Sequence, residues 1–223
     1  MKYRLTKNTR TFGECILYQI EALKNFGEIK KGDLGGWIEA ANNLSQDGLC
    51  WVYGDAQVYG DAWVCDNAQV CGDAQVYGDA QVYGDARVYG DAQVYGDARV
   101  YGDAQVYGDA QVYGDAWVYG DAWVCGDAWV CGDAWVCGDA RVYGRRDMLA
   151  CGPIGSRGSY TTMCKSKTGV IVSCGCFLGN LDQFEMAVRR THGGTIYGQE
   201  YMALIALARV RFGGGDDAPT IAN

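Results

Sequence analysis

Apolar residues in the middle of the chain recur with a period of six. Val stands at every sixth position from Val52 to Val142, and Ala stands four residues after each Val from Ala56 to Ala140. Gly-Asp precedes each of these Ala residues, except that Asp66-Asn67 replaces it once. A strict period of six is not a helix period, and it is typical of β-solenoids built from hexapeptides.

The repeat also predicts which side chains face inward. Alternate side chains of a strand point to opposite sides, so Val and Ala line a narrow core while Tyr and Gln face outward. Gly-Asp forms each corner, because Gly tolerates unusual dihedrals and Asp can hydrogen-bond its own backbone. Three corners close a coil of about eighteen residues, so the sixteen Val-centred hexads predict about five coils in a mainly β, parallel β-helix roughly 25 Å tall.

The repeat divides the chain into four parts. We expect residues 1–50 to form an N-terminal cap, 51–144 the β-helix, 145–212 a small α+β domain, and 213–223 a disordered tail. Caps are expected because the bare strand edges at the ends of a solenoid invite aggregation unless they are covered.

The C-terminal part predicts a hairpin and two helices. Residues 160–166 and 170–177 alternate like two strands around a Lys167-Thr168-Gly169 turn. A capping-box pair starts a helix at Asn180, and His192-Gly193 ends it. A second helix is expected over 199–211, with its apolar residues on one side.

Several segments resemble known proteins. The Val-x-Gly-Asp-Ala-x period over 51–144 resembles the left-handed β-helix of the hexapeptide-repeat, LpxA-like superfamily, and the left hand is implied by that resemblance. Lys2-Tyr3-Arg4-Leu5 and Gly35-Gly36-Trp37-Ile38 resemble the start of an enterobacterial hexapeptide protein labelled an acyltransferase, and also many phage and prophage proteins. Three C-terminal strings resemble a small phage domain: Gly152-Pro153-Ile154-Gly155-Ser156-Arg157, Gly175-Cys176-Phe177 and Thr191-His192-Gly193.

Charge and composition narrow the partners and the location. The net charge is −8, and an acidic chain lacks the clustered Lys and Arg that a phosphate backbone requires, so no nucleic-acid partner is predicted. No stretch reaches the ~20 apolar residues of a membrane span, and no signal-peptide run follows the N-terminus. We therefore expect no membrane partner, a bacterial cytoplasmic location, and eleven cysteines that are reduced thiols.

Candidates for catalysis are few. The superfamily resemblance implies an acyltransferase with a His general base on the β-helix, but the one His of the chain, His192, lies outside the repeat. His192 is the candidate base, and its competing interpretation is a residue favoured by the dipole at a helix C-terminus. We predict no catalytic residue and no cofactor, while acyl-CoA-dependent acyl transfer remains the alternative function.

The C-terminal cysteines and the stacked Asp residues are the candidate metal ligands. Cys174 and Cys176 are expected to share one strand face, with Cys164 on the partner strand, so zinc could bind there together with Cys151 and His192. Their spacing fits none of the usual zinc patterns, and small core residues are the favoured interpretation. The stacked Asp residues could recruit Ca²⁺, but turn amides and water satisfy them in the favoured interpretation. No metal is predicted.

The outward aromatic residues are the most informative candidates. Tyr and Trp dominate protein interfaces, and four successive hexads carry Trp next to the C-terminal domain. We therefore predict a protein partner or self-association into a homo-oligomer. The alternatives are docking of the chain's own C-terminal domain and drift of the repeat sequence. The function expected is a non-catalytic binding or scaffold protein of phage or prophage origin. The predicted binding residues are Trp117, Trp123, Trp129, Trp135, Tyr95 and Tyr113.

Overall fold

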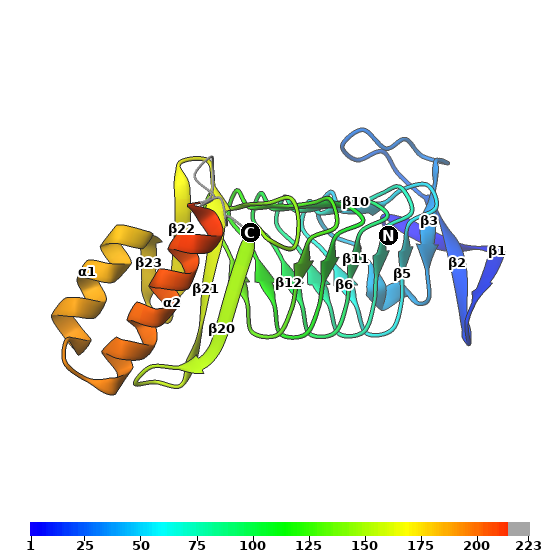
Figure 1. The fold of residues 1–223 in the computed structure, drawn as a ribbon. Coiled ribbons are helices and arrows are strands. Elements are labelled where there is room, and N and C mark those ends of the chain that lie inside the picture. Colours follow the sequence, from blue (N-terminus) through cyan, green and yellow to red (C-terminus); the bar gives the residue numbers. More distant parts are fainter. Residues whose placement is uncertain (214–223) are drawn as a thin grey trace, which may run out of the picture.

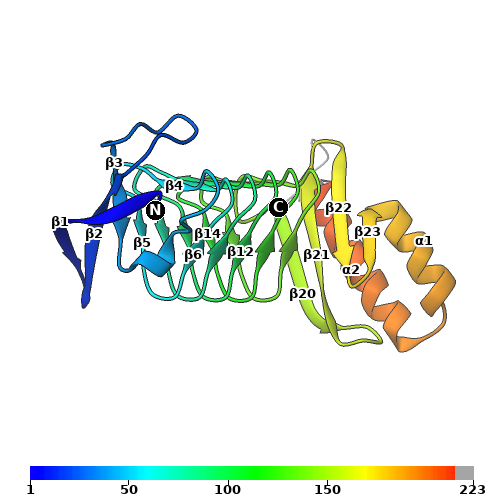
Figure 2. The same cartoon turned by 180° about the vertical axis from the view of Figure 1, so that it is seen from behind.

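A β-helix forms the centre of the molecule, with a cap at each end (Figures 1 and 2). The computed structural model describes residues 1–213, so the predicted tail lies almost entirely outside the described residues. No helix within residues 1–213 combines the length and apolar character needed to cross a membrane.

Three parallel sheets form the faces of the β-helix. The first face has the order β3-β5-β8-β11-β14-β17, the second β4-β7-β10-β13-β16-β19, and the third β6-β9-β12-β15-β18. The strands are β4 (Trp51–Val52), β5 (Gln57–Val58), β6 (Trp63–Val64), β7 (Gln69–Val70), β8 (Gln75–Val76), β9 (Gln81–Val82), β10 (Arg87–Gly90), β11 (Gln93–Val94), β12 (Arg99–Val100), β13 (Gln105–Gly108), β14 (Gln111–Val112), β15 (Trp117–Val118), β16 (Trp123–Val124), β17 (Trp129–Val130), β18 (Trp135–Val136) and β19 (Arg141–Val142).

The β-helix has about six turns, one more than the hexads alone predict. The extra turn comes from β3 (Leu34–Ile38), which pairs in parallel with β5, and from Leu44, which bridges Val64 on the third face. The repeat pattern did not predict β3 or the Leu44 bridge, because neither segment carries the Gly-Asp-Ala signal of the repeat.

Successive turns stack residues eighteen positions apart. Gln93 lies over Gln111 and Val94 over Val112, with the amide of Gln93 donating to the carbonyl of Ala110 at 2.9 Å. The repeat Val and Ala side chains from Val52 to Val142 are fully buried, which confirms the predicted inward face. Because each turn places the same repeat positions over those of the next, the outward side chains at equivalent positions form columns parallel to the helix axis.

The N-terminal cap closes one end with an antiparallel hairpin. Strands β1 (Tyr3–Phe12) and β2 (Cys15–Ala22) extend the first face, and a short 3-10 helix, η1 (Ala41–Asn43), precedes Leu44. The Tyr3 hydroxyl donates to the Leu44 carbonyl at 2.6 Å, and the Lys2 ammonium donates to the Cys50 carbonyl at 2.9 Å. Both side chains are buried, so the first turn is covered by packing as well as by hydrogen bonds.

The C-terminal domain covers the other end with a four-stranded antiparallel sheet, and two helices pack on its far side (Figure 2). Strand β21 lies against the last turn, where the Thr162 hydroxyl accepts from the Trp135 amide at 3.0 Å. The predicted hairpin and both helices are confirmed, with two further strands and an earlier start of the second helix. The elements are β20 (Met148–Ile154), β21 (Ser159–Ser166), β22 (Gly169–Cys174), β23 (Phe177–Asn180), α1 (Leu181–His192) and α2 (Ile196–Phe212).

Candidate functional site

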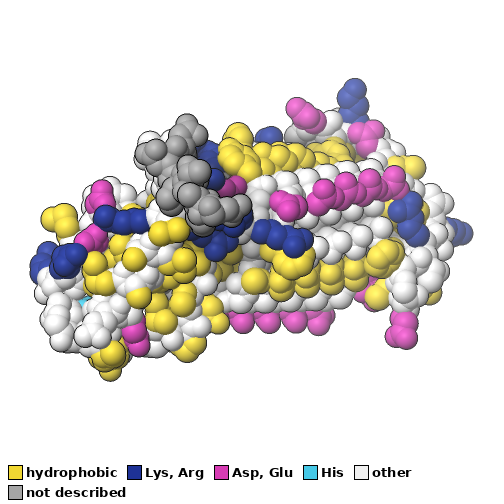
Figure 3. Space-filling model, viewed as in Figure 1, with side chains coloured by type: hydrophobic (Ala, Val, Ile, Leu, Met, Phe, Trp, Pro, Cys, Tyr) yellow, Lys and Arg dark blue, Asp and Glu magenta, His cyan; other side chains and the backbone are white. Residues whose placement is uncertain are grey.

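The outward Tyr residues form stacked aromatic columns. On the first face Tyr77, Tyr95 and Tyr113 lie parallel, with ring centroids 4.9 Å and 5.0 Å apart. The Tyr95 hydroxyl reaches Oε1 of Gln111 at 3.4 Å, so Tyr and Gln columns support each other. The rings are only half-exposed, because stacking covers their flat faces. Rows of hydrophobic side chains therefore run beside rows of Asp along the β-helix (Figure 3).

The four predicted Trp residues are spread over all three faces. Trp117 and Trp135 stack on the third face with centroids 5.3 Å apart, while Trp123 lies on the second face and Trp129 on the first. The four Trp residues therefore form one Trp–Trp pair and two Trp rings on separate faces, and Trp123 packs edge-on against Tyr107 at 6.4 Å. Trp129 is the most exposed of the four, at 39%.

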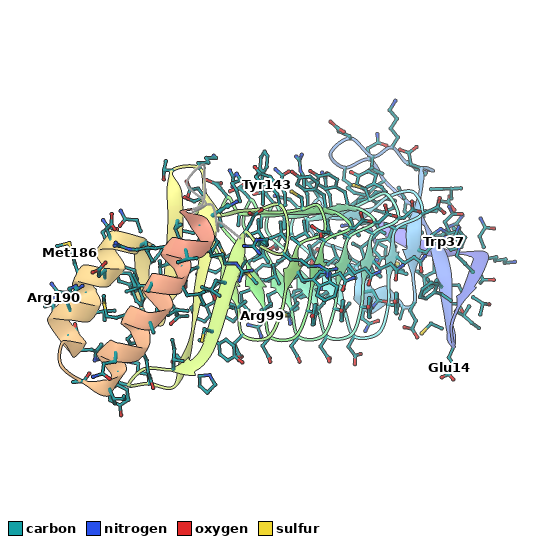
Figure 4. The ribbon with its side chains drawn as sticks, viewed as in Figure 1. Glu14, Trp37, Arg99, Tyr143, Met186 and Arg190 are labelled. Atoms are coloured by element: carbon teal, nitrogen blue, oxygen red, sulfur yellow. The ribbon has the colours of Figure 1, made fainter. Side chains whose placement is uncertain are left out.

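Arginine side chains of the same chain cover three of these rings. The guanidinium carbons of Arg99, Arg141 and Arg145 lie 5.0, 4.5 and 3.7 Å from the rings of Trp117, Trp123 and Trp129, respectively. Cation–π contacts of this kind contribute about 0.5–1 kcal/mol at exposed sites. Each guanidinium thus covers part of the face of its Trp ring within the same chain. Figure 4 shows Arg99 on the outside of the β-helix.

Trp135 lies at the junction with the C-terminal domain. It lines a cavity of about 530 Å³ together with Asp133 on the β-helix and Pro153, Tyr160 and Ser173 on the terminal sheet. Its backbone amide donates a hydrogen bond to the hydroxyl of Thr162. Trp135 therefore lies against the chain's own terminal domain.

The three candidate zinc-binding cysteines do not converge. Cys164 is buried on the side of the terminal sheet that packs on the β-helix, where burial raises its thiol pKa. Cys174 lies on the opposite side with the helices, and Thr161 donates to its sulfur at 3.1 Å. Strand β22 ends at Cys174, so the expectation that exposed Cys176 shares its strand face is wrong. Within residues 1–213 no cluster of three or more potential metal ligands occurs.

A second cavity, of about 250 Å³, lies in the C-terminal domain. Its wall contains the β20–β21 loop with Arg157, the β22–β23 turn with Cys176, and the end of α1 with His192. Three strings that lie far apart in the sequence therefore meet at one place. The shared resemblance of these strings to one small domain was the signal, but sequence reasoning did not join them into a site.

Tyr201 of α2 closes the inner end of this terminal-domain cavity. Burial, followed by its contact with Cys174, raises the pKa of the Tyr201 hydroxyl to about 12, so the phenol is neutral near pH 7. The His192 ring centroid lies 5.8 Å from that of Tyr201. His192 is thus a cavity residue at the C-terminus of α1, far from the repeat faces.

Helix α2 exposes an apolar stripe that the sequence did not single out. Its inward side buries Tyr201, Leu204, Ile205 and Ala208, as the periodicity predicted. Its outward side repeats the i, i+3, i+4, i+7 spacing of a helical face, with Leu207 50% and Val210 79% exposed. Hydrophobic side chains gather over α2 in Figure 3. The outer stripe consists of Ala203, Ala206, Leu207 and Val210.

The β-helix and the C-terminal domain carry net charges of opposite sign. Residues 51–144 contain fifteen Asp against three Arg, a net charge of −12. Residues 145–213 contain nine Lys or Arg against four Asp or Glu, a net charge of +5. The overall charge of −8 therefore conceals a basic terminal domain, whose charge favours anionic ligands.

Part of the chain matches known proteins. The YdcK β-solenoid repeat matches residues 56–72, 74–90, 80–93, 92–108, 104–120 and 110–126. The chain is also 37% identical over 60 residues to "Uncharacterized acetyltransferase YdcK" of Escherichia coli (strain K12). That match covers 23% of this chain and 18% of the relative, so the chain spans under a fifth of that protein. Residues 56–126 thus consist of YdcK-type solenoid repeats, and the chain is built around a hexapeptide-repeat β-helix.

Proposed function

We propose that this chain is a non-catalytic binding or scaffold protein whose contacts are made by the C-terminal domain and by the outward Tyr and Trp columns. The exposed outer stripe of α2 is the main support for this function. Leu207 and Val210 face solvent although α2 already buries a complete apolar side against the sheet. Contiguous exposed apolar surface of this kind marks interaction sites in soluble proteins.

The β-helix suits a scaffold role. Its stacked turns are joined by regular backbone hydrogen bonds of about 2.8–3.1 Å, and its core is made of fully buried Val and Ala. Such a rod holds its two capped ends at a fixed separation and angle. The Tyr columns then add long, amphipathic strips on which a partner could lie.

Sedimentation velocity of the full chain tests the contact surface. We expect wild type to sediment as more than one chain, and Leu207→Gln with Val210→Gln to sediment as a monomer. Met186→Gln is the matched control, because Met186 is 72% exposed on α1 away from the stripe (Figure 4). An identical assembly state in wild type and the double variant contradicts an α2 interface.

The Trp columns are tested separately. Trp123→Gln with Trp129→Gln removes two outward rings on different faces and should change assembly if those faces carry the contact. An unchanged mass in solution would remove the Trp residues from the interface and leave α2 as the contact surface.

The proposed function includes the source of the chain and its place in the cell. We infer a phage or prophage source from the resemblance of the N-terminal and C-terminal segments to phage proteins. A bacterial cytoplasm then follows as the place of action. Fractionation of cells that express the tagged full chain checks this, with recovery in the membrane or periplasm contradicting it.

Acyl transfer is the second candidate, favoured by the printed name of the similar E. coli protein. Its general base would have to be His192, which is in the terminal domain rather than on a repeat face. Incubation with acetyl-CoA and a panel of amines should release free thiol in wild type and not in His192→Ala. Absence of release in wild type removes this candidate.

A further inference from the structure

The terminal-domain cavity has features that the proposed protein contacts do not use. It lies between the β20–β21 loop, the β22–β23 turn and the facing side of α1, on a different surface from the outer stripe of α2. At about 250 Å³ it falls below the roughly 300 Å³ at the lower end of pockets for drug-sized ligands. The volume therefore suits a ligand of only about ten non-hydrogen atoms, or a single side chain.

The floor of the cavity is apolar. Phe177, Phe184 and Val188 line it, with the two Phe rings 5.1 Å apart. Phe184 in turn packs edge-on against Tyr201 at 5.6 Å. Phe184 and Val188 are buried in the hydrophobic core between the terminal sheet and its two helices, so this floor is held in place by the packing of α1 and α2 on the sheet.

The rim of the cavity carries a cation without a partner. Arg157 makes no salt bridge with any residue of the described range. Its Nη1 lies close to Gly175, since a Cβ built at Gly175 would be 3.7 Å away. The carboxylate of Glu200 on α2 accepts from the Gly155 amide at 2.8 Å and forms no salt bridge with Arg157. Among the described residues the guanidinium thus has no anionic partner, and it can pair with an anionic ligand at the cavity mouth.

The site is preorganised by its glycines. A Cβ at Gly155 would overlap the Tyr201 hydroxyl, so only Gly lets the β20–β21 loop approach α2 this closely. Gly175 has φ +57°, in the left-handed region that favours Gly, and it sets the turn that presents Cys176 and Phe177. Little backbone ordering is then required when a ligand enters.

We propose that this cavity binds a small apolar group that carries one carboxylate. The apolar group lies on Phe177, Phe184 and Val188, and the carboxylate pairs with Arg157 in the bidentate geometry that a guanidinium favours. The +5 charge of residues 145–213 attracts such an anion. The ligand can be a free carboxylic acid or the C-terminal residue of a peptide, because both present the same chemistry.

Amide-detected NMR titration of the full chain tests the site with phenylacetate as the probe. We expect shifts confined to residues that line the cavity and a Kd on the order of 1 mM or tighter. Phenylacetamide, which has the same shape without the charge, should bind at least about tenfold more weakly. Acetyl-Gly-Phe and its C-terminal amide distinguish the two sources: tighter binding of the peptide acid than of phenylacetate identifies a chain terminus, and the reverse a free acid.

Three variants keep the proposal falsifiable. Arg157→Gln should raise the Kd for phenylacetate about tenfold or more and leave the remaining spectrum unchanged. Arg190→Gln is the matched control, because Arg190 is exposed on α1 (Figure 4) and does not line the cavity, so it should change the Kd less than about twofold. Ala187→Phe fills the cavity and should abolish binding of all probes. Equal binding of acid and amide, an unchanged Kd in Arg157→Gln, or no binding by any probe would each overturn the assignment.

Discussion

Glycine fixes the corners of the β-helix at the residue scale. Gly102 has φ +71°, and a Cβ placed there would lie 3.1 Å from the amide nitrogen of Gly120 in the next turn. Two costs therefore coincide, one from the left-handed backbone and one from the close approach of stacked turns. Asp66 is the one described non-Gly residue with positive φ, and its neighbour in the next turn, Gly84, donates to its carboxylate at 3.1 Å.

Substitution of a corner glycine should therefore destabilise the β-helix. Gly102→Ala places a methyl group against the next turn and holds Ala in the left-handed region, so we expect a loss of about 2 kcal/mol or more in the free energy of unfolding. Asp103→Ala is the adjacent control on the exposed corner, with an expected change within about 0.5 kcal/mol. Urea denaturation followed by circular dichroism measures both, and equal stability of the two variants contradicts the argument.

Buried thiols and phenols make the fold sensitive to high pH. Burial, followed by the charge of Asp66, raises the pKa of the Cys65 thiol from 9.0 to about 12, and burial raises that of Tyr59 from 10.0 to about 12. The folded state holds these protons more tightly than the unfolded chain. Their contribution to stability is complete below pH 9 and is lost as the pH rises through the folded pKa near 12.

Thermal unfolding across this alkaline window measures the effect. We expect Tm to stay level from neutral pH to about pH 8.5 and then to fall steadily. Cys65→Ala removes one titrating group, so its Tm should fall less over the same interval, whatever its value at neutral pH. An identical Tm slope in Cys65→Ala and wild type means that this thiol does not contribute.

Local sequence signals determine the elements only where the element is itself local. The period of six predicted the strands of the β-helix, and the Asn180 cap predicted α1, because each depends on residues within one turn. β20 and β23 were missed, since both are defined by pairing with β21 or β22 rather than by alternation of their own. α2 begins at Ile196, three residues early, because Thr195 caps it at the amide of Gly198.

The same limit applies to the candidate site. Arg157, Cys176 and His192 lie on three elements, and no pattern in the sequence states that these elements meet. Cys164 and Cys174 were expected to lie together because neighbouring strands carry them, but they point to opposite sides of the sheet. Which side a strand residue faces depends on register, and register here is fixed by the β-helix below and the helices above.

The capping box of α1 is a contribution that can be measured. The Asn180 side chain accepts from the Gln183 amide at 2.8 Å, and the Gln183 side chain accepts from the Asn180 amide at 3.0 Å. Asn180→Ala should destabilise α1 by about 1 kcal/mol, whereas Asn180→Asp keeps the acceptor and should change little. Hydrogen exchange of the α1 amides reports this directly. Equal exchange rates in the Ala and Asp variants would contradict a role for the side chain.

At the scale of the whole molecule, the repeat separates the length of the rod from the orientation of its ends. Each hexad advances the chain by one face, and each set of three returns it to the same face one strand spacing further along. The core columns of Val and Ala are identical at every hexad, so the interior accepts a change of register between hexads. Only the relative rotation of the N-terminal cap and the C-terminal domain distinguishes one register from another.

Deletions of different lengths therefore separate folding from scaffold geometry. Removal of residues 93–110 takes out one complete turn and should shorten the rod by about 4.8 Å while the two ends keep their relative orientation. Removal of residues 93–98 takes out one hexad and should leave a folded β-helix whose C-terminal domain is rotated by roughly a third of a turn, because successive hexads lie on three successive faces. Residual dipolar couplings of cap and terminal-domain amides measure that angle.

Unfolding of the first deletion, or an unchanged angle in the second, would show that side-chain identity along the columns fixes the register. If both deletions behave as expected, a partner that touches both ends of the molecule should bind the full-turn deletion and fail to bind the single-hexad deletion.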